Sequence, residues 1–520
     1  MEQDPNSSRF NYFNHLIFAI SIFQAFNLVY GQTEGFYKDL FMDGGVELTS
    51  RTTLPAADAL GLEWEYIATS SENMQSEIMI ENEWDQNGLL LYPDGAPRYA
   101  MIYTNGGSAT NHGNSLGETG RDRVREFYNH GGSYSGSCAG AYIASRSYMT
   151  SGTYTPYYHI WPGRTEPTNL ENTYTGHFIS DQSPLLNYFD FGGDSYIADV
   201  YHNGGCTIRE DIDFPPGTEV LLRYDYPDMP MHNRPSCWAY KENEQSGRVV
   251  VIGSHPEGAT SGEPYNLMQA IILYALDGCG RPALKGELQN GQTRFMNKST
   301  NDNDPSFTKL GDKQYHHYKI EIPVGSNNLK ITVNSADSID LSVFLKQGDF
   351  AFSGSAGYQE TGTGDDLVLS IPDIPPGDWY ASVKCETTVK TVKQSWGYSY
   401  SENRDILNGV AYSIMAEWDT TATSIVADNL IPVQFQLEQN YPNPFNPSTT
   451  IAYTLPTEGT VELSVFDVNG RLVKVLRHGV EPAGSHAIRY DAGPLSSGIY
   501  FYQLKFGSEN ILTKRMIKVD

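Results

Sequence analysis

The stretch Gly132-Ser-Tyr-Ser-Gly136-Ser-Cys138-Ala-Gly140-Ala-Tyr-Ile-Ala144 decides how the first half of the chain is interpreted, because it predicts a strand that turns sharply into a helix. Gly136 and Gly140 lie two residues before and two after Cys138, where small residues allow a tight turn without side-chain clashes. The cysteine then lies at a helix N-terminus, where the helix dipole favours the thiolate. The pattern predicts a nucleophilic Cys138, with the amide of Ala139 directed toward a developing oxyanion.

A second motif, Ile252-Gly-Ser-His255-Pro-Glu257, supplies the base that a thiolate nucleophile needs for acyl transfer. It directly follows the apolar run Arg248–Ile252, which is typical of a strand buried on both faces. His255 is the predicted base and later the acid, and Glu257 is expected to orient its imidazole.

Several other residues are expected around the same cleft. The glycines of Asn105-Gly106-Gly107 follow a predicted neighbouring strand and are expected to offer a second oxyanion amide. The run Asn203-Gly204-Gly205 predicts either a loop lining the cleft or a plain hairpin turn. The candidate cleft-lining residues are Asn105, Ser137, Asn203, Gly204 and Gly205.

From about Lys38 to Gly280, short apolar runs alternate with helix-like stretches. The runs at 39–42, 99–103 and 248–252 predict strands, and residues 117–130 predict a helix with Val124, Phe127 and Tyr128 on one stripe. Strands that alternate with helices predict an α/β layer fold with a mainly parallel sheet.

After about Arg281 the helical pattern ends and short segments alternate with period two. Such strands between Gly, Pro and Asp turns predict a β-sandwich over residues 285–420. A boundary near 428–439 precedes a smaller all-β unit, residues 432–520. The predicted strands are 318–322, 329–333, 340–345, 367–371 and 379–383 in the first, and 450–455, 461–466 and 499–504 in the second.

Composition narrows the class of protein. The 520 residues carry 35 basic and 62 acidic side chains, a net charge of −27, which argues against nucleic-acid partners. The apolar segment Leu16–Val29 is too short for a comfortable membrane span, so residues 1–31 predict a secretory signal peptide; the alternative is a buried N-terminal helix.

The five cysteines are too sparse for a disulfide scaffold, and an odd number in an exported chain implies at least one free thiol. The sequence allows a disulfide between Cys206 and Cys237 in an oxidising compartment. No cysteine or histidine spacing indicates a metal site, and no cofactor is expected.

Residues 36–280 resemble a class I glutamine amidotransferase-like domain. The more specific similarity is to the N-terminal domain of biotin-protein ligases, and it rests on 131–142, 201–205 and 253–257. The resemblance implies a flavodoxin-like sheet and a Cys-His-Glu triad formed by Cys138, His255 and Glu257. Neither a synthetase domain nor a biotin-ligase catalytic domain is recognised in this sequence, so glutamine-fed biosynthesis is not expected.

The two β regions carry resemblances of their own. Residues 285–420 are similar to the pre-peptidase C-terminal domain of secreted hydrolases, on 341–345 and 375–383, which implies an accessory or substrate-adhering role. Residues 432–520 look like a type IX secretion sorting domain, an Ig-like β-sandwich, on 440–451, 465–471 and 495–502. That family implies recognition by the secretion machinery at the outer membrane.

Together these features predict a multidomain protein, with an α/β flavodoxin-like domain followed by two all-β sandwich domains. We expect a cysteine hydrolase, secreted or held at the cell surface after export through the periplasm and across the outer membrane, without a stable membrane span. It would act on an amide or γ-glutamyl-type bond of a small-molecule or peptide substrate. The alternatives are a non-catalytic binding or adhesion protein and a cysteine peptidase on the same fold.

Overall fold

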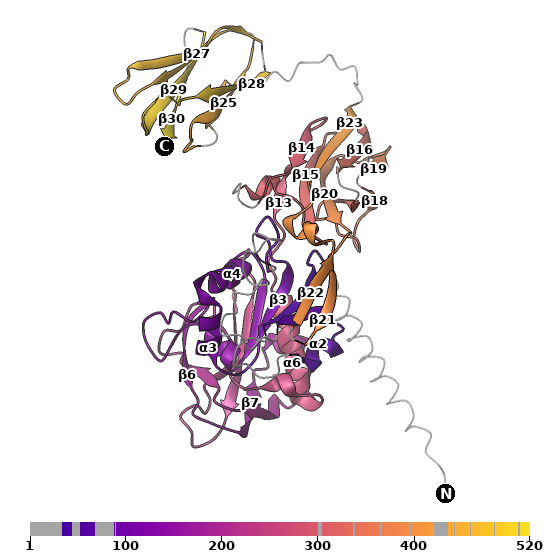
Figure 1. The fold of residues 1–520 in the computed structure, drawn as a ribbon, viewed down its shortest axis with the longest axis vertical. Helices are drawn as coiled ribbons and strands as arrows, with labels where there is room; N and C mark the ends of the chain where they lie inside the picture. Colours follow the sequence, from indigo (N-terminus) through magenta and orange to yellow (C-terminus); the bar gives the residue numbers. More distant parts are fainter. Residues whose placement is uncertain are drawn as a thin grey trace. The chain divides into compact units, whose positions relative to one another are not determined.

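The protein is multidomain and rich in β-structure, and its chain divides into two compact units, Met1–Thr421 and Ala422–Asp520 (Figure 1). The predicted signal peptide at residues 1–31 lies outside the described residues. The structure, a computed structural model, describes residues 34–43, 52–67, 88, 90–299, 304–335, 339–363, 367–395, 397–420, 435–437, 439–440, 443–457, 459–482, 484–493, 495–507 and 510–519.

A nine-stranded sheet in the order β2-β1-β3-β4-β12-β11-β10-β7-β8 organises the first part of unit 1. The first five strands of that order pair in parallel, and the remaining pairs are antiparallel. The strands are β1 Lys38–Asp43, β2 Trp64–Ile67, β3 Tyr99–Thr104, β4 Ser133–Ser137, β7 Thr173–Ile179, β8 Tyr196–His202, β10 Glu219–Asp225, β11 Pro235–Tyr240 and β12 Val249–Ile252.

The prediction of a mainly parallel sheet is therefore wrong for the half that contains β7, β8, β10 and β11. The connections at residues 226–234 and 241–248 are too short to cross over the sheet, since a parallel crossover needs about a dozen residues or more. Short connections force neighbouring strands to run antiparallel. A small separate sheet, β5-β6-β9, adds to this part; its strands are β5 Ser145–Tyr148, β6 Trp161–Pro167 and β9 Cys206–Ile208.

Strand β12 shows why the centre of the sheet is so apolar. Val249 and Val251 belong to one buried core, whereas Val250 and Ile252 belong to a second core on the other face. This confirms the prediction of a strand buried on both faces.

Helices contribute to the two buried cores that lie on opposite faces of the sheet. Helix α4 places Val124, Phe127 and Tyr128 in the first core, as its sequence stripe predicts, and α6 fills the second. The helices are α2 Pro55–Ala59, α3 Ala109–Ser115, α4 Gly117–Asn129, α5 Ala139–Ala144 and α6 Gly262–Leu276, with 3-10 turns η1 Pro184–Asn187, η2 Phe191–Gly193 and η3 Pro256–Gly258.

The second part of unit 1 consists of two sheets around one core, with orders β13-β15-β20-β17-β18 and β14-β23-β16-β19. All five strands predicted between 318 and 383 lie within strands of these sheets. The elements are β13 Leu284–Glu287, β14 Thr293–Met296, η5 Pro305–Phe307, β15 Tyr315–Ile322, β16 Ser326–Asn334, β17 Asp340–Gln347, β18 Tyr358–Thr363, β19 Leu367–Ile371, β20 Gly377–Cys385, β21 Lys390–Gln394, β22 Gly397–Glu402, η6 Arg404–Asn408 and β23 Tyr412–Thr420.

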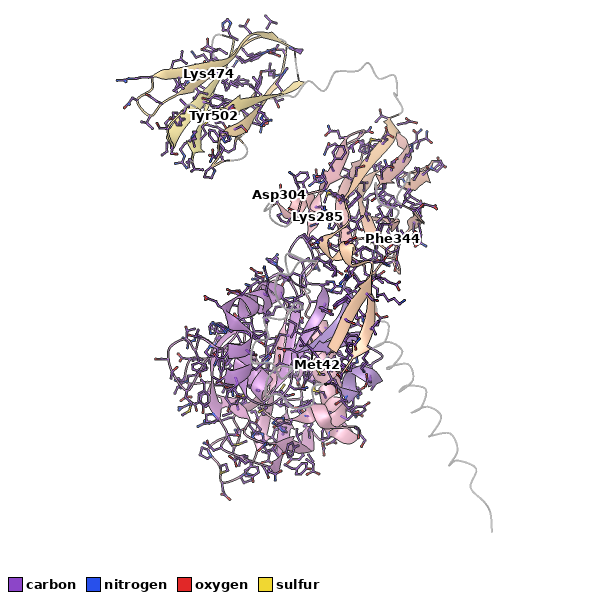
Figure 2. All side chains as sticks on the ribbon, in the orientation of Figure 1. Met42, Lys285, Asp304, Phe344, Lys474 and Tyr502 are labelled. Atoms are coloured by element: carbon purple, nitrogen blue, oxygen red, sulfur yellow. The ribbon has the colours of Figure 1, made fainter. Side chains whose placement is uncertain are left out.

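A buried ion pair joins these two parts of unit 1. The Arg98 guanidinium donates to both carboxylate oxygens of Asp312, at 3.0 Å each, and both side chains are 1 % exposed. The Tyr37 ring lies 3.9 Å from the guanidinium carbon, a cation–π contact. A second bridge runs from Lys285 to Asp94, at 2.5 Å (Figure 2 labels Lys285).

The β21–β22 hairpin, orange in Figure 1, leaves the sandwich and lies beside β2, the edge strand of the nine-stranded sheet. The rings of Tyr398 and Tyr66 meet at 5.3 Å, and the Tyr400 hydroxyl donates to Glu65 at 3.0 Å. Covering an edge strand prevents it from pairing with another chain. The sandwich therefore covers the edge of the nine-stranded sheet, in addition to supplying the partner of Arg98.

Replacing Arg98 by Met tests this joint. Asp312 would lose its buried counter-charge, and breaking such a pair costs about 3–5 kcal/mol. Urea unfolding of unit 1 should report that loss in the free energy of unfolding. The double variant Arg98→Met with Asp312→Leu should recover most of the lost free energy of unfolding. An unchanged urea midpoint in the single variant would show that the ion pair does not stabilise the contact between the two parts of unit 1.

Unit 2 is a small all-β body with its own core. Its sheets have the orders β24-β25-β28 and β27-β26-β29-β30, and the three strands predicted here lie within β25, β26 and β29. The Tyr502 hydroxyl accepts the main-chain N–H of Asn440 at 2.7 Å, which holds the start of this unit against its core (Figure 2 labels Tyr502). The strands are β24 Gln436–Leu437, β25 Ser448–Leu455, β26 Gly459–Phe466, β27 Leu472–Glu481, β28 Gly484–Asp491, β29 Gly498–Phe506 and β30 Asn510–Lys518.

Within the described ranges, none of the helices has the length and apolar character needed to cross a membrane.

Candidate active site

Cys138 is the single residue between β4 and α5, and its backbone has φ 47° and ψ −99°. A positive φ is rare for a residue with a side chain and persists only where the surroundings impose it. The Cys138 N–H donates to the Ile252 carbonyl of β12 at 2.9 Å, and the Cys138 carbonyl accepts from Ala141 and Tyr142 at 3.0 Å. Strand and helix thus hold the turn from both sides.

The flanking glycines are required by close backbone approach. A methyl group on Gly136 would lie 2.7 Å from the Gly140 backbone, and one on Gly140 would lie 2.1 Å from the Thr104 carbonyl oxygen. Backbone atoms cannot yield as a flexible side chain does. The Gly-x-Cys-x-Gly spacing is therefore a steric condition for bringing α5 against β3 and β4.

Substituting Gly140 by Ala should strain this turn, and overpacking of this kind costs about 1–3 kcal/mol. Thermal unfolding should show a clear loss relative to Gly152→Ala, a matched control because a methyl group there meets nothing within 4 Å. Equal melting temperatures for the two variants would show that the close approach is not needed.

His255 and Glu257 form a direct pair. The imidazole Nδ1 lies 2.9 Å from the Glu257 Oε1, and η3 folds the chain so that the two residues face each other. Glu257 is buried, with 3 % of its side chain exposed. The His255 N–H donates to the Tyr201 carbonyl at 2.8 Å, which fixes the backbone of this turn at the end of β8.

Cys138 is the third member of this cluster, beside the His255–Glu257 pair. Burial lowers the pKa of His255, but the hydrogen bonds and charges of Cys138 and Glu257 outweigh it and raise that pKa to about 11. The imidazole therefore holds its second proton at neutral pH. The Cys138 Sγ lies 3.7 Å, and the His255 Nε2 3.2 Å, from the same main-chain carbonyl oxygen, that of Asn203.

The candidate oxyanion residues lie around this group. A methyl group on Gly106 would lie 2.1 Å from the His255 ring and 3.4 Å from the Cys138 Cβ, so Gly106 adjoins both side chains. Gly107 follows with φ 139°. Ala139 opens α5, and the first amides of a helix have no acceptor within the helix.

The loop Asn203–Gly205 adjoins the same group. It connects β8 to β9, which belong to different sheets, so it is not a plain hairpin turn. The Tyr142 hydroxyl donates to the carbonyls of Gly204 and Gly205, at 3.4 and 3.1 Å. A methyl group on Gly205 would lie 1.8 Å from the Gly253 carbonyl, which shows how tightly this loop packs on the turn before His255.

Two of the candidate cleft-lining residues, Ser137 and Asn105, contact neighbouring side chains. The Ser137 Oγ bonds the Tyr103 hydroxyl at 2.8 Å, and the Asn105 Nδ2 contacts the Met42 sulfur at 3.5 Å (Figure 2 labels Met42). Both side chains are fully buried. Successive residues of a strand point to opposite faces, so Ser137 points into the core beside the turn that presents Cys138.

All five cysteines are free thiols, so the Cys206–Cys237 disulfide is not formed. Burial raises the pKa of both Cys206 and Cys237 far above the ordinary range, which disfavours their thiolates. Neither has the histidine partner that Cys138 has.

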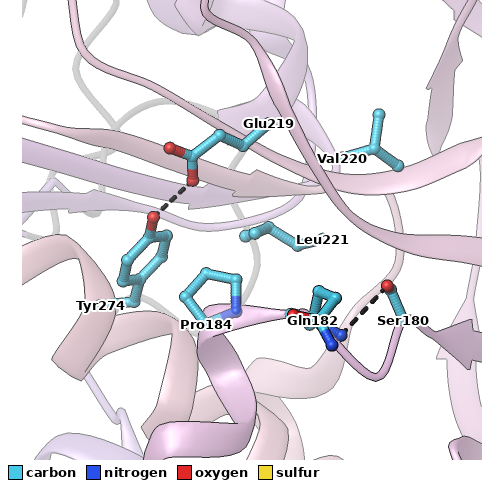
Figure 3. Close-up of a pocket in the computed structure, with 8 residues that line it drawn as sticks. Ser180, Gln182, Pro184, Glu219, Val220, Leu221 and Tyr274 are labelled. Carbon is cyan, nitrogen blue, oxygen red and sulfur yellow. Dashed lines mark hydrogen bonds between the residues drawn. The ribbon is translucent and has the colours of Figure 1, made fainter.

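A separate pocket of about 430 Å³ lies between the turn after β7, the start of β10 and Tyr274 of α6 (Figure 3). The Tyr274 hydroxyl donates to Glu219 there, and the Gln182 N–H donates to the Ser180 Oγ. None of the candidate site residues lines this pocket. The candidate nucleophile and base thus lie elsewhere in the fold.

Comparison with protein families identifies the class of two segments. Residues 439–518 match the secretion system C-terminal sorting domain, which is of the type IX kind. Such a domain directs export across the outer membrane, so the protein is secreted or held at the cell surface. The prediction of its localisation is confirmed.

Residues 87–151 match the biotin-protein ligase N-terminal domain. The match includes Cys138 and ends before His255 and Glu257. The protein therefore combines a biotin ligase-like N-terminal domain with a sorting tail. No curated protein matches the chain.

Solved structures show distant likenesses. The pre-peptidase C-terminal domain of collagenase from Bacillus anthracis is 11 % identical over 26 % of this chain and 100 % of its own, with a TM-score of 0.17. A GH2 β-galacturonidase from Eisenbergiella tayi is 11 % identical over 39 % of this chain, with a TM-score of 0.13. The matched region spans about a third of that glycosidase (34 %). TM-scores this low carry no argument about fold or activity.

Proposed function

We propose that the protein is a secreted cysteine hydrolase that cleaves an amide or γ-glutamyl-type bond, with Cys138 as nucleophile, His255 as base and acid, and Glu257 as the orienting carboxylate. The observation that carries this proposal is the strained Cys138 backbone beside the His255–Glu257 pair. Strained residues and perturbed histidines gather at functional sites.

The strand order supports a flavodoxin-like core for residues 36–280. Numbered along the chain, the parallel strands β2-β1-β3-β4-β12 have the order 2-1-3-4-5, which is that of flavodoxin-like sheets. Ligands in such folds bind beyond the carboxyl ends of the strands, and both Cys138 and His255 follow the carboxyl ends of β4 and β12. We assign residues 285–420 and 432–520 to the two sandwich domains.

In the proposed reaction the Cys138 thiolate attacks the substrate carbonyl carbon, and the carbonyl π-electrons move onto its oxygen. The amides of Ala139 and of the Gly106–Gly107 turn would stabilise that oxyanion. As the C–N bond breaks, the His255 imidazolium gives its Nε2 proton to the leaving nitrogen, which departs as an amine. Water, deprotonated by the now neutral His255, then attacks the thioester, releases the acid and regenerates the thiolate.

The test is alkylation of Cys138 with limiting iodoacetamide at pH 6 and pH 9, followed by peptide mass spectrometry. A thiolate held by a protonated His255 should label rapidly at pH 6, because the thiolate rather than the thiol is the nucleophile. His255→Ala should lower that rate at least about tenfold, the equivalent of one pKa unit, and Glu257→Gln should lower it less.

Cys237 provides the internal control, since it is buried, lacks a histidine partner and should label slowly at both pH values. Slow labelling of Cys138 that His255→Ala does not alter would overturn the hydrolase proposal. The alternative would then be a secreted binding or adhesion protein that keeps the fold.

A further inference from the structure

Three consecutive residues at the end of β8 contact the turn that carries His255. The Tyr201 carbonyl accepts the His255 main-chain N–H at 2.8 Å. The His202 Nδ1 lies 2.9 Å from the Ser254 Oγ, and the Asn203 carbonyl lies 3.2 Å from the His255 Nε2. Three contacts therefore join the two segments: Tyr201 and Asn203 contact the main chain and the ring of His255, and His202 contacts Ser254.

His202 is the fully buried member of this set. Its Nε2 lies 2.6 Å from the Thr168 Oγ1, which also lies 2.9 Å from the Gly205 carbonyl. Its Nδ1 bonds the Ser254 hydroxyl, and in the neutral ring one of these two nitrogens donates and the other accepts. His202 thus links the Asn203–Gly205 loop on one side to the His255 turn on the other.

We propose that His202 is a positioning residue for His255: its bond to Ser254 holds the Asn203 carbonyl at the His255 Nε2. This inference rests on the proposed function and adds to it a residue outside the triad. His202 touches neither Cys138 nor the site of bond cleavage, so it acts through the placement of Asn203 and His255.

The groups around His202 keep this contact constant with pH. The Tyr224 ring lies 5.5 Å away, and Ser254 also contacts the Nε2 of His177 at 3.4 Å. Burial lowers the pKa of both His202 and His177 to about 3. Neither imidazole changes charge between pH 5 and 9 in the folded protein, so His255 is the protonated histidine of this cluster in that range.

The contact matters because His255 Nε2–H needs an acceptor while the imidazole is protonated. Nδ1 has the Glu257 carboxylate, and Nε2 has the Asn203 carbonyl. Both acceptors lack a proton to offer, so together they favour the imidazolium. Loosening Asn203 removes one of the two and weakens the protonated state that stabilises the Cys138 thiolate.

Two substitutions separate the two bonds of His202 in the full-length protein. His202→Asn retains a hydrogen-bonding group near the position of Nδ1 for Ser254, whereas His202→Gln retains one near the position of Nε2 for Thr168. Ser254→Ala removes the proposed contact from the other side. Ser236→Ala is the matched control, because Ser236 bonds His177 at 2.8 Å in the same buried cluster and contacts neither His202 nor Ser254.

The readout is the rate of Cys138 alkylation by iodoacetamide at pH 6 and pH 9, together with the melting temperature. We expect His202→Gln and Ser254→Ala to lose about tenfold in rate at pH 6, the equivalent of one pKa unit, and little at pH 9. His202→Asn and Ser236→Ala should keep the pH 6 rate within about twofold, which is about 0.4 kcal/mol.

Unchanged pH 6 rates in both His202→Gln and Ser254→Ala would overturn the inference while leaving the triad intact. Equal losses at both pH values that follow the melting temperature would also overturn it, because a purely structural role predicts that pattern. Slow pH 6 labelling of Cys138 in the unsubstituted protein would overturn the proposed function, and this inference with it.

Discussion

The candidate site depends on one steric constraint, the contact of helix α5 with the carboxyl ends of β3 and β4. Gly140 meets the Thr104 carbonyl so closely that no side chain fits between them. Because the helix begins against the sheet, the chain must turn within the single residue Cys138, which takes a positive φ. The strain places the thiol at the helix start, beside the strand end from which His255 emerges.

The second constraint is electrostatic and concerns the proton on His255. Its two ring nitrogens face Glu257 and the Asn203 carbonyl, which are both acceptors. Burial alone would favour the neutral imidazole, yet the pKa of His255 rises to about 11. The same burial leaves His202 neutral, with a pKa of about 3. Two histidines in one cluster thus differ in charge because His255 has Cys138 and the Glu257 carboxylate as partners, whereas burial dominates at His202.

Sequence reasoning located the candidate residues that combine a reactive side chain with a position at the end of a predicted strand. Cys138 and His255 each follow a predicted strand, and that is where the structure has them. The Asn203 carbonyl could not be recognised as an acceptor, because a main-chain atom leaves no signal in the residue type. The inward direction of Ser137 follows from the pleat, and the pairing of Arg98 with Asp312 joins residues 214 apart in the chain. Patterns of local periodicity contain no information on a long-range pair such as Arg98 with Asp312, and they also missed the antiparallel half of the sheet.

The joint between the α/β part and the sandwich has a consequence for where the chain can be cut. Trimming at the apparent domain border near residue 283 would remove Asp312, the counter-charge of Arg98, and would uncover strand β2, whose free edge could then pair with another chain. A truncation that keeps the candidate site together with both contacts therefore retains the whole sandwich, through Thr420. Unit 2, by contrast, keeps a core of its own, so a protease that clips off the sorting tail takes no core residue from the rest.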